Sequence, residues 1–301
     1  MIVALVACQR DAPRASPAAS ASAPKPGGST AVAARTAASA PARGAADDSE
    51  DALIKEAFPD WGGQHGHVAT IAGRDAFEGE IQVAITPAFV LAVDDTHRVL
   101  VATGAVADEM GVGHLTEGTL GAYWFARRES RWFVSHREDS IVRDGTFGHV
   151  GKVARFDLGA GHPAVTVYSE NCEFGNCLGS LYVVELWPDK SSLAINGIQV
   201  VSRAGTTDGV CSRALAGGRE ASSAPEHVSP EDCFDIAGTW RIEPRAGSER
   251  PDFVVQFKGH ELDDDPATNP AAVKTIDQAL VFRYAAGKYT VASGNNPTRG
   301  I

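Results

Sequence analysis

The sequence predicts an antiparallel all-β domain over residues 49–301. Short apolar or alternating runs recur along this part of the chain, as expected for strands that bury one face. Short polar turns such as Asp94-Asp95-Thr96 and Pro188-Asp189-Lys190 separate many of them. Helical periodicity is confined to the first residues of the domain. These observations together favour a meander of strands over a mixed fold.

The first element is one short helix, Ser49 to Phe58. Asp48 or Ser49 can serve as its N-cap, and Pro59 ends it. Every later element reads as a strand. We expect strands at Val68–Ala72, Ile81–Thr86, Phe89–Val93, Arg98–Thr103, Leu120–Arg127, Arg131–Ser135, Val153–Leu158, Ala164–Tyr168, Ser180–Trp187, Leu193–Val201, Thr239–Ile242, Phe253–Phe257, Ala279–Tyr284 and Tyr289–Ala292.

These runs align as a weak internal repeat of four strands, in which a longer loop joins the second strand to the third. The copies span Phe89–Ser135, Val153–Val200 and Thr239–Ala292, and an insertion at 205–235 precedes the last one. Serial four-stranded antiparallel units are how a β-propeller is built. We therefore expect a propeller-like domain, with a β-sandwich or an irregular barrel as the alternatives.

The second copy resembles an FG-GAP repeat, the blade motif of integrin-type propellers. Phe147-Gly148 and the run Phe156–Val167 carry the resemblance, which covers about twenty residues of one copy. The acidic residues that bind calcium in that family are replaced by Leu158, Ala160 and His162. The resemblance thus implies blades but no calcium site.

The N-terminus carries a second resemblance. Leu5-Val6-Ala7-Cys8 resembles the lipobox of bacterial lipoproteins, where a signal peptidase cuts and a diacylglycerol is attached to the cysteine. Residues 1–8 lack the basic and long apolar regions of a signal peptide, so we expect the true start to lie upstream. A chance apolar N-terminus that ends in cysteine is the alternative. The resemblance implies lipidation at Cys8, a periplasm-facing location and, because Gln9 follows the cysteine, the outer membrane.

Residues 9–48 are mostly Ala, Pro, Ser and Gly, with Val32 as the one large aliphatic residue before Asp47. Such a segment cannot bury enough apolar surface to offset its ordering entropy. We expect a disordered tether with a root-mean-square span of roughly 35 Å. No apolar run of about eighteen residues follows, so the sequence predicts no membrane span beyond the N-terminus.

Charge excludes one class of partner. The chain has 27 basic and 38 acidic residues, a net charge of −11. The tether holds five of the basic and three of the acidic residues, so the domain carries 22 against 35, a net charge of −13. An acidic domain repels phosphate backbones, and we expect no nucleic-acid partner.

Four cysteines lie in the domain, and their even number fits an oxidising compartment. Cys172 and Cys177 flank the turn Glu173-Phe174-Gly175-Asn176, and pairing them leaves Cys211 with Cys233. The alternative is a four-cysteine zinc site. Zinc ribbons usually bring their ligands as two close pairs, however, and only one pair is close here.

No catalytic motif has the required spacing. Gly145 to Gly151-Lys152 is one residue too long for a phosphate loop, and Ser180 lacks the second glycine of a nucleophile elbow. His260-Glu261-Leu262-Asp263 has no second histidine for a zincin site. His65 and His67 are weak candidates for a metal site, but glycine-rich loops more often leave such histidines in solvent. We expect neither a metal nor a cofactor.

The loops between second and third strands are the strongest functional candidates. They are Gly104–Thr119, Ser169–Gly179 and Gly259–Ile276, and homologous blades would present them on one face. Loops longer than about twelve residues in a compact domain are often functional. A solvated charged rim is the alternative. The candidate face comprises Asp108, Glu109, Glu117, Glu173, Glu261, Asp263, Asp264 and Asp265.

These features favour a non-catalytic binding protein whose partner is an envelope protein or glycan. One alternative is a periplasmic hydrolase that uses the loop carboxylates as acid and base. The other is a structural envelope lipoprotein without a specific ligand. A hydrolase requires two carboxylates that face each other across a cleft, whereas a binding protein requires only a continuous surface.

Overall fold

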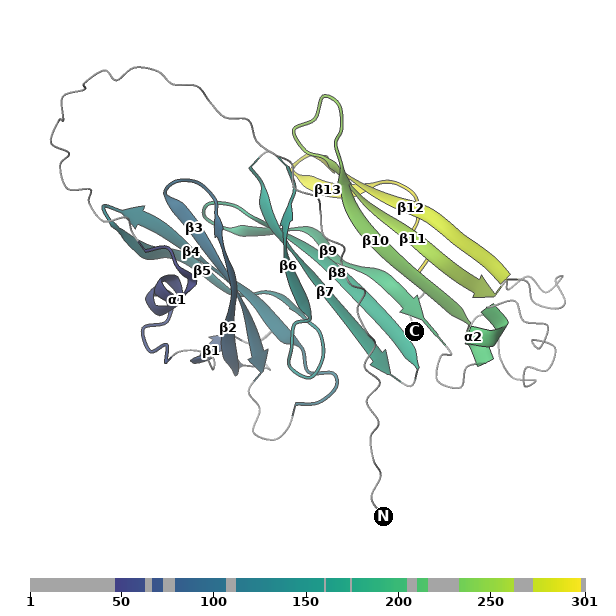
Figure 1. Cartoon of the computed structure of the whole chain (residues 1–301), viewed down its shortest axis with the longest axis horizontal. Helices are drawn as coiled ribbons and strands as arrows, with labels where there is room; N and C mark the ends of the chain where they lie inside the picture. The colour runs from purple at the N-terminus through teal and green to yellow at the C-terminus, as the bar shows by residue number, and fades with distance from the viewer. Residues whose placement is uncertain are drawn as a thin grey trace, which may run out of the picture. The chain divides into compact units, whose positions relative to one another are not determined.

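Alternating apolar residues and tight turns produce a chain of antiparallel strands, as the sequence predicts. The computed structural model describes residues 47–62, 67–72, 79–106, 112–159, 161–173, 175–204, 210–215, 233–262 and 273–298 (Figure 1). All of them belong to one unit, residues 43–301. The lipobox-like residues 5–8, most of the predicted tether, and the loop residues Asp108, Glu109 and 263–265 lie outside these ranges.

The predicted N-terminal helix is confirmed as α1, Glu50–Ala57. Ser49 is its N-cap, because the Ser49 hydroxyl accepts a hydrogen bond from the Ala52 amide at 3.2 Å. The helix buries Leu53 and Ile54 on one face. Among the described residues, no helix is both long enough and apolar enough to cross a membrane.

The first sheet is a five-stranded meander in which each strand pairs with the next. Its outer strands approach each other, so the sheet curls into a half-barrel around α1. Tyr123 and Phe125 point into the core that α1 closes, whereas Trp124 points to the opposite face. Its strands are β1 (His67–Ala72), β2 (Glu80–Ala92), β3 (His97–Val106), β4 (Gly118–Arg128) and β5 (Arg131–Asp144).

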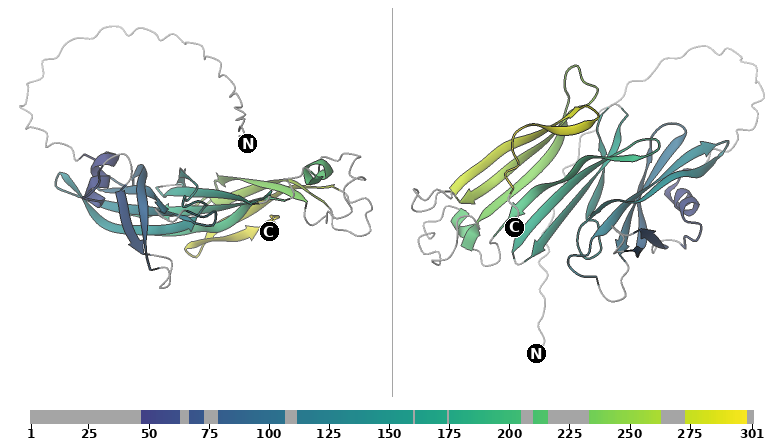
Figure 2. Two further views of the ribbon diagram at one scale, coloured as in Figure 1. Left: turned by 90° about the horizontal axis from the view of Figure 1, so that it is seen from below. Right: turned by 180° about the vertical axis from the view of Figure 1, so that it is seen from behind.

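The second sheet has eight strands, again paired in chain order. Its strands are β6 (Lys152–Asp157), β7 (Pro163–Glu173), β8 (Asn176–Leu186), β9 (Ser191–Arg203), β10 (Phe234–Glu243), β11 (Asp252–Leu262), β12 (Val273–Ala285) and β13 (Lys288–Ser293). In the chain, the helix α2 (Val210–Leu215) comes between β9 and β10, and it packs against β11 (Figure 2).

The predicted all-β class is therefore confirmed, and the predicted repeat units take a different arrangement. The second unit is β6 to β9 and the third is β10 to β13. Three residue pairs between β9 and β10, such as Ile236 with Ser202, join these units into one sheet. In the described residues they are parts of one sheet rather than separate blades.

The two sheets pack against each other through an apolar cluster. Val99 and Val101 of β3 and Trp124 of β4 meet Val165 of β7 and Val184 of β8. A hydrogen bond also crosses between the sheets: Trp124 Nε1 donates to the carbonyl of Trp187, just after β8, at 2.6 Å. Each central strand of the first sheet thus contributes to two cores, one on either face.

Both predicted disulfides are present. Cys172 and Cys177 face each other across the β7–β8 hairpin with a Cα–Cα distance of 4.0 Å. Cys211 of α2 pairs with Cys233, just before β10, at a Cα–Cα distance of 5.1 Å. The alternative of a four-cysteine zinc site is wrong, because the two pairs form separate bonds.

Candidate functional site

A polar cavity of about 500 Å³ lies where the end of β5 meets the tip of the β7–β8 hairpin. We call it the hairpin pocket. One residue comes from β5 and the others come from the two hairpin strands. The lining residues are Asp144, Ser169, Asn171, Glu173, Asn176, Leu178 and Ser180.

Strand alternation places the hairpin residues on one face. Ser169 lies opposite Ser180, Asn171 opposite Leu178, and Glu173 opposite Asn176 in the antiparallel register. Successive side chains on a strand point to opposite faces, so these three cross-strand pairs share the side that lines the pocket. The hairpin therefore presents a row of polar groups to the cavity.

Asp144 reaches the pocket from the first sheet. It pairs with Gly118 at the end of β5, and its Oδ1 accepts a hydrogen bond from the Gly145 amide at 2.6 Å. Gly145 has φ +95°, and a Cβ there would lie on the His149 carbonyl, so this turn requires glycine. The sharp turn fixes the Asp144 carboxylate next to the hairpin.

Two acceptor oxygens in the pocket are buried without a hydrogen-bond partner in the described structure. One is Asp144 Oδ2 and the other is Asn171 Oδ1. Buried polar atoms are almost always hydrogen-bonded, so an unpaired acceptor costs free energy unless a donor arrives from outside. Asp144 and Asn171 both line the same cavity, so a ligand that donates hydrogen bonds from this cavity could satisfy both acceptors.

The charge of the lining residues restricts which class of ligand can bind in the pocket. Asp144 and Glu173 bring two carboxylates, and none of the described residues that line this cavity is cationic. Such a lining repels anionic ligands. Hydroxyl groups, amides or a positively charged group can satisfy it, and Leu178 offers one apolar contact to a ligand's carbon face.

Side chains on the face of the β7–β8 hairpin that points away from the pocket fix the position of β7. Arg203 of β9 donates to Glu170 Oε1 at 2.8 Å and to Asp235 of β10 at 3.0 Å. The Tyr168 hydroxyl donates to Glu170 Oε2 at 2.6 Å. Burial of Tyr168 is the main cause that raises the pKa of its hydroxyl, and the hydrogen bond to Glu170 is the second cause. The contacts of Arg203 tie β7 to β9 and β10 behind the pocket.

Three residues of the predicted acidic face are described, and they do not form one surface. Glu173 lines the pocket, and Glu117 lies beside Arg143, with 3.9 Å between their charged atoms, next to Asp144 in the chain. Glu261 is different, because it is buried in β11 and pairs with Lys274 of β12 at 2.6 Å. That carboxylate is part of the sheet and does not present a free acidic surface.

The predicted metal candidates do not form a described site. His65 lies outside the described residues. His67, at the start of β1, is half-buried and its ring contacts Phe58 and Trp61 at centroid distances of 5.5 and 6.5 Å. Its observed role is packing against the end of α1.

The sequence placed Ser169–Gly179 among the candidate loops but selected only Glu173 from it, and most of this predicted loop is the paired end of β7 and β8. The signal for the hairpin part was present, since Ser169, Asn171 and Glu173 stand at every second position before the predicted turn and Asn176 and Ser180 follow it. The contribution of β5 gave no such signal, because Asp144 lies beyond the predicted end of that strand. The missed residues are Asp144, Ser169, Asn171, Asn176, Leu178 and Ser180.

A second charged cluster pairs opposite charges, although Glu185 Oε1 and Arg250 Nη1 have no hydrogen-bond partner with good geometry in the described structure. Glu185 is buried and pairs with Arg250 at 2.7 Å and with His162 at 2.9 Å. The Arg250 guanidinium also lies over the rings of Tyr284 and Trp187, at 4.5 and 5.3 Å from their centroids. Opposite charges and aromatic faces surround one another here, and no described cavity includes these residues, so the function is sought in the hairpin pocket.

Comparisons with protein-family models, with curated proteins and with solved structures find no match for the chain. The function is therefore argued from the hairpin pocket.

Proposed function

We propose that this protein is a lipid-anchored protein of the bacterial cell envelope whose domain binds a neutral, hydroxyl-rich ligand in the hairpin pocket. The observation that carries the proposal is the pair of buried, unpartnered acceptors, Asp144 Oδ2 and Asn171 Oδ1. Sugar hydroxyls are donors that fit both. The role is binding, and no catalytic step is part of it.

A glycan fits the pocket better than a protein partner or an anionic ligand. The volume is within the range of small-molecule sites, about 300 to 1,000 Å³. Carboxylate, amide and hydroxyl groups alternate along the lining, which suits a ligand with several hydroxyls. A protein partner would need a broader surface, and an anionic ligand would meet Asp144 and Glu173. The proposal requires no propeller, because one hairpin and one strand end form the site.

The test is binding of neutral chitin oligosaccharides, with sulfated oligosaccharides as the anionic comparison, measured by calorimetry. Asp144→Asn keeps an acceptor for the Gly145 amide and replaces the free oxygen with a donor. We expect affinity for the neutral sugars to fall about tenfold or more, since a hydrogen bond to a charged group contributes about 1.5 to 3 kcal/mol.

Two further variants separate binding from folding. Asn171→Leu removes the second unpaired acceptor, so it should weaken binding while stability stays equal or rises. Asp157→Asn is the matched control, because Asp157 also holds a glycine amide, that of Gly159 at 2.7 Å, outside the pocket. Unchanged affinity in Asp144→Asn, or an equal loss in Asp157→Asn, would contradict the proposal.

The anchor is a separate part of the proposal, and the Leu5-Val6-Ala7-Cys8 resemblance supports it. In the lipidated protein, Cys8→Ser should move the chain from the membrane fraction to the soluble periplasmic fraction. Membrane association that persists in Cys8→Ser would contradict the proposed lipid anchor. It would not bear on the proposed ligand binding in the hairpin pocket.

A hydrolase is the second candidate, because Asp144 and Glu173 bring two carboxylates to one cavity. A general acid and a base on either side of a glycosidic bond are what glycoside hydrolysis requires. Release of shorter sugars that Glu173→Gln abolishes would favour this candidate. Binding without product release favours the binding protein.

A further inference from the structure

The two disulfides of this chain differ in accessibility. Cys211 and Cys233 are 3% and 0% exposed and pack with Ala214 and Leu262. Cys172 is exposed and Cys177 is only partly buried. Thiol–disulfide exchange requires that a thiolate reach a sulfur atom, so a reductant can attack the hairpin bond but not the buried one.

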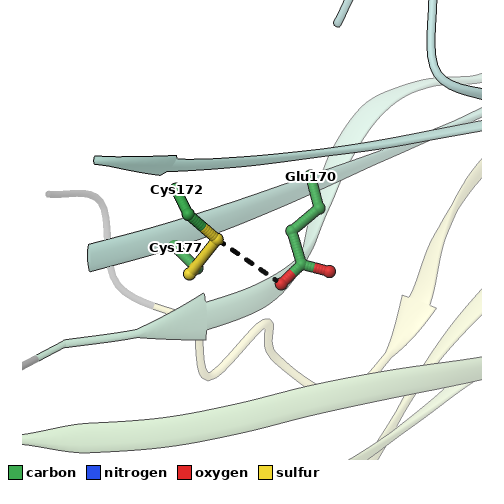
Figure 3. A group of neighbouring side chains, drawn as sticks. All are labelled: Glu170, Cys172 and Cys177. Carbon is green, nitrogen blue, oxygen red and sulfur yellow. Dashed lines mark hydrogen bonds between the residues drawn. A yellow bond between two sulfur atoms is a disulfide. The ribbon is translucent and has the colours of Figure 1, made fainter. Parts of the chain in front are cut away.

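A third ligand-type group lies beside the exposed bond. Glu170 and Cys172 are two residues apart on β7 and therefore share a face, and Cys177 stands opposite Cys172 on β8. Glu170 Oε1 lies 3.9 Å from Cys172 Sγ, as Figure 3 shows. One carboxylate oxygen and the two sulfur atoms all lie within 4.8 Å of one another.

We infer that reduction of the Cys172–Cys177 bond creates a site for a thiophilic divalent cation, with Glu170, Cys172 and Cys177 as its ligands. Two thiolates and one carboxylate form a donor set that zinc accepts in tetrahedral sites, with the fourth position open to water or a further ligand. The site lies on the opposite face of β7 from the hairpin pocket.

The redox step uses a dithiol as reductant. Its thiolate attacks Sγ of Cys172, the sulfur–sulfur bond breaks, and Cys177 leaves as a thiolate that takes up a proton. The second thiol of the reductant then displaces Cys172 and closes a new disulfide on the reductant. Two electrons and two protons pass to the protein. The cation then displaces both thiol protons when it binds.

The surrounding structure supports a site that survives reduction. Ten residue pairs hold β7 to β8, so the two cysteines stay opposite each other after the bond opens. The Tyr168 hydroxyl holds Glu170 Oε2 and leaves Oε1 toward the sulfur atoms. Arg203 also donates to Oε1, and its positive charge competes with the cation. A preformed carboxylate orientation of this kind is what outer-shell partners give metal ligands.

The experiment uses the folded full chain carrying Cys8→Ser, so that Cys8 contributes no thiol. After treatment with dithiothreitol under native conditions and removal of the reductant, we expect two reactive thiols. Titration with Co²⁺ should then give the charge-transfer and visible bands of tetrahedral thiolate coordination, and Zn²⁺ should displace them. The oxidised protein should give neither.

Glu170→Gln tests the third ligand and should weaken Co²⁺ and Zn²⁺ binding about tenfold or more. Glu243→Gln is the control, because Glu243 is likewise an exposed strand glutamate paired with an arginine, Arg241 at 2.6 Å. Release of four thiols, absence of the Co²⁺ bands after reduction, or equal affinity in Glu170→Gln would overturn the inference. None of these outcomes bears on sugar binding.

Discussion

Single carboxylates organise the tight turns of this protein, and Asp94 is the clearest case. Its side chain accepts hydrogen bonds from the Thr96 amide at 2.7 Å and the Thr96 hydroxyl at 2.9 Å, and it pairs with His97 at 2.8 Å. The backbone hydrogen bond from Thr96 is the main cause that lowers the pKa of Asp94 to about 2; His97 assists and partial burial opposes.

This shift predicts a defined loss of stability in acid. The ordinary pKa is 3.8, so the folded pKa lies below it and the carboxylate stabilises the fold above that value. The contribution should disappear as the pH falls from about 4 to about 2. Because the side chain is 46% exposed, we expect less than about 1 kcal/mol.

Asp94→Asn should therefore lower the free energy of unfolding at pH 7 and make it less dependent on pH below 4. Asp95→Asn removes an equal charge from the same turn and serves as the control. Urea unfolding at pH 7 and pH 3 measures both variants. Equal pH dependence in Asp94→Asn and the unmodified protein would show that the turn hydrogen bonds do not depend on the charge.

Residue types predicted the core better than the site. Tyr123, Trp124 and Phe125 lie in a strand that the apolar pattern predicted, and all three are fully buried. The two disulfides also followed from spacing. The pocket did not, because Asp144 and Asn171 come from different sheets and only the packing of those sheets brings them together. No local pattern in the sequence encodes that contact.

At the scale of the elements, most strands were predicted and their limits were less accurate. Pro87 divides the predicted runs Ile81–Thr86 and Phe89–Val93, yet β2 continues through it with a bulge between Pro87 and Phe89. The polar stretch 136–144 was not predicted as strand, yet it extends β5 to Asp144. It has no apolar alternation, since most of its side chains are polar and only Val142 is buried, and it supplies Asp144, one of the pocket's two carboxylates.

The indole of Trp124 contributes to the junction between the sheets both by packing and by a hydrogen bond. Trp124 is fully buried, and its Nε1 donates to the Trp187 carbonyl in the other sheet. Trp124→Phe should cost about 2 to 4 kcal/mol, because it removes the hydrogen bond to the part-buried Trp187 carbonyl and opens a small cavity in the apolar cluster. Thermal or urea unfolding measures this loss.

Trp240→Phe is the matched control for the indole. Trp240 is only partly buried and packs on the second sheet against Tyr168, so its substitution should cost clearly less. A similar loss in both variants would mean that the hydrogen bond between the sheets contributes little to stability.

At the scale of the whole molecule, the repeat pattern predicted that consecutive strands within a unit pair with each other. It did not predict that the second and third units pair edge to edge. The edge strand of a unit can pair with a strand of the neighbouring unit or remain unpaired. The alternation of apolar and polar residues along that strand is the same in both cases, so the sequence pattern does not distinguish them. Here β9 and β10 pair, and the last two units form one sheet. The packing of that sheet on the half-barrel then creates the hairpin pocket.

The central claim is that the hairpin pocket binds a hydroxyl-rich ligand. The most direct measurement is a titration of the isotope-labelled full chain, carrying Cys8→Ser, with chitin oligosaccharides while backbone amide chemical shifts are followed. The account predicts saturable shifts concentrated at Asp144, Gly145 and residues 169–180, with little change in β12 and β13. Saturable shifts centred elsewhere in the domain, or none with any neutral sugar, would contradict it.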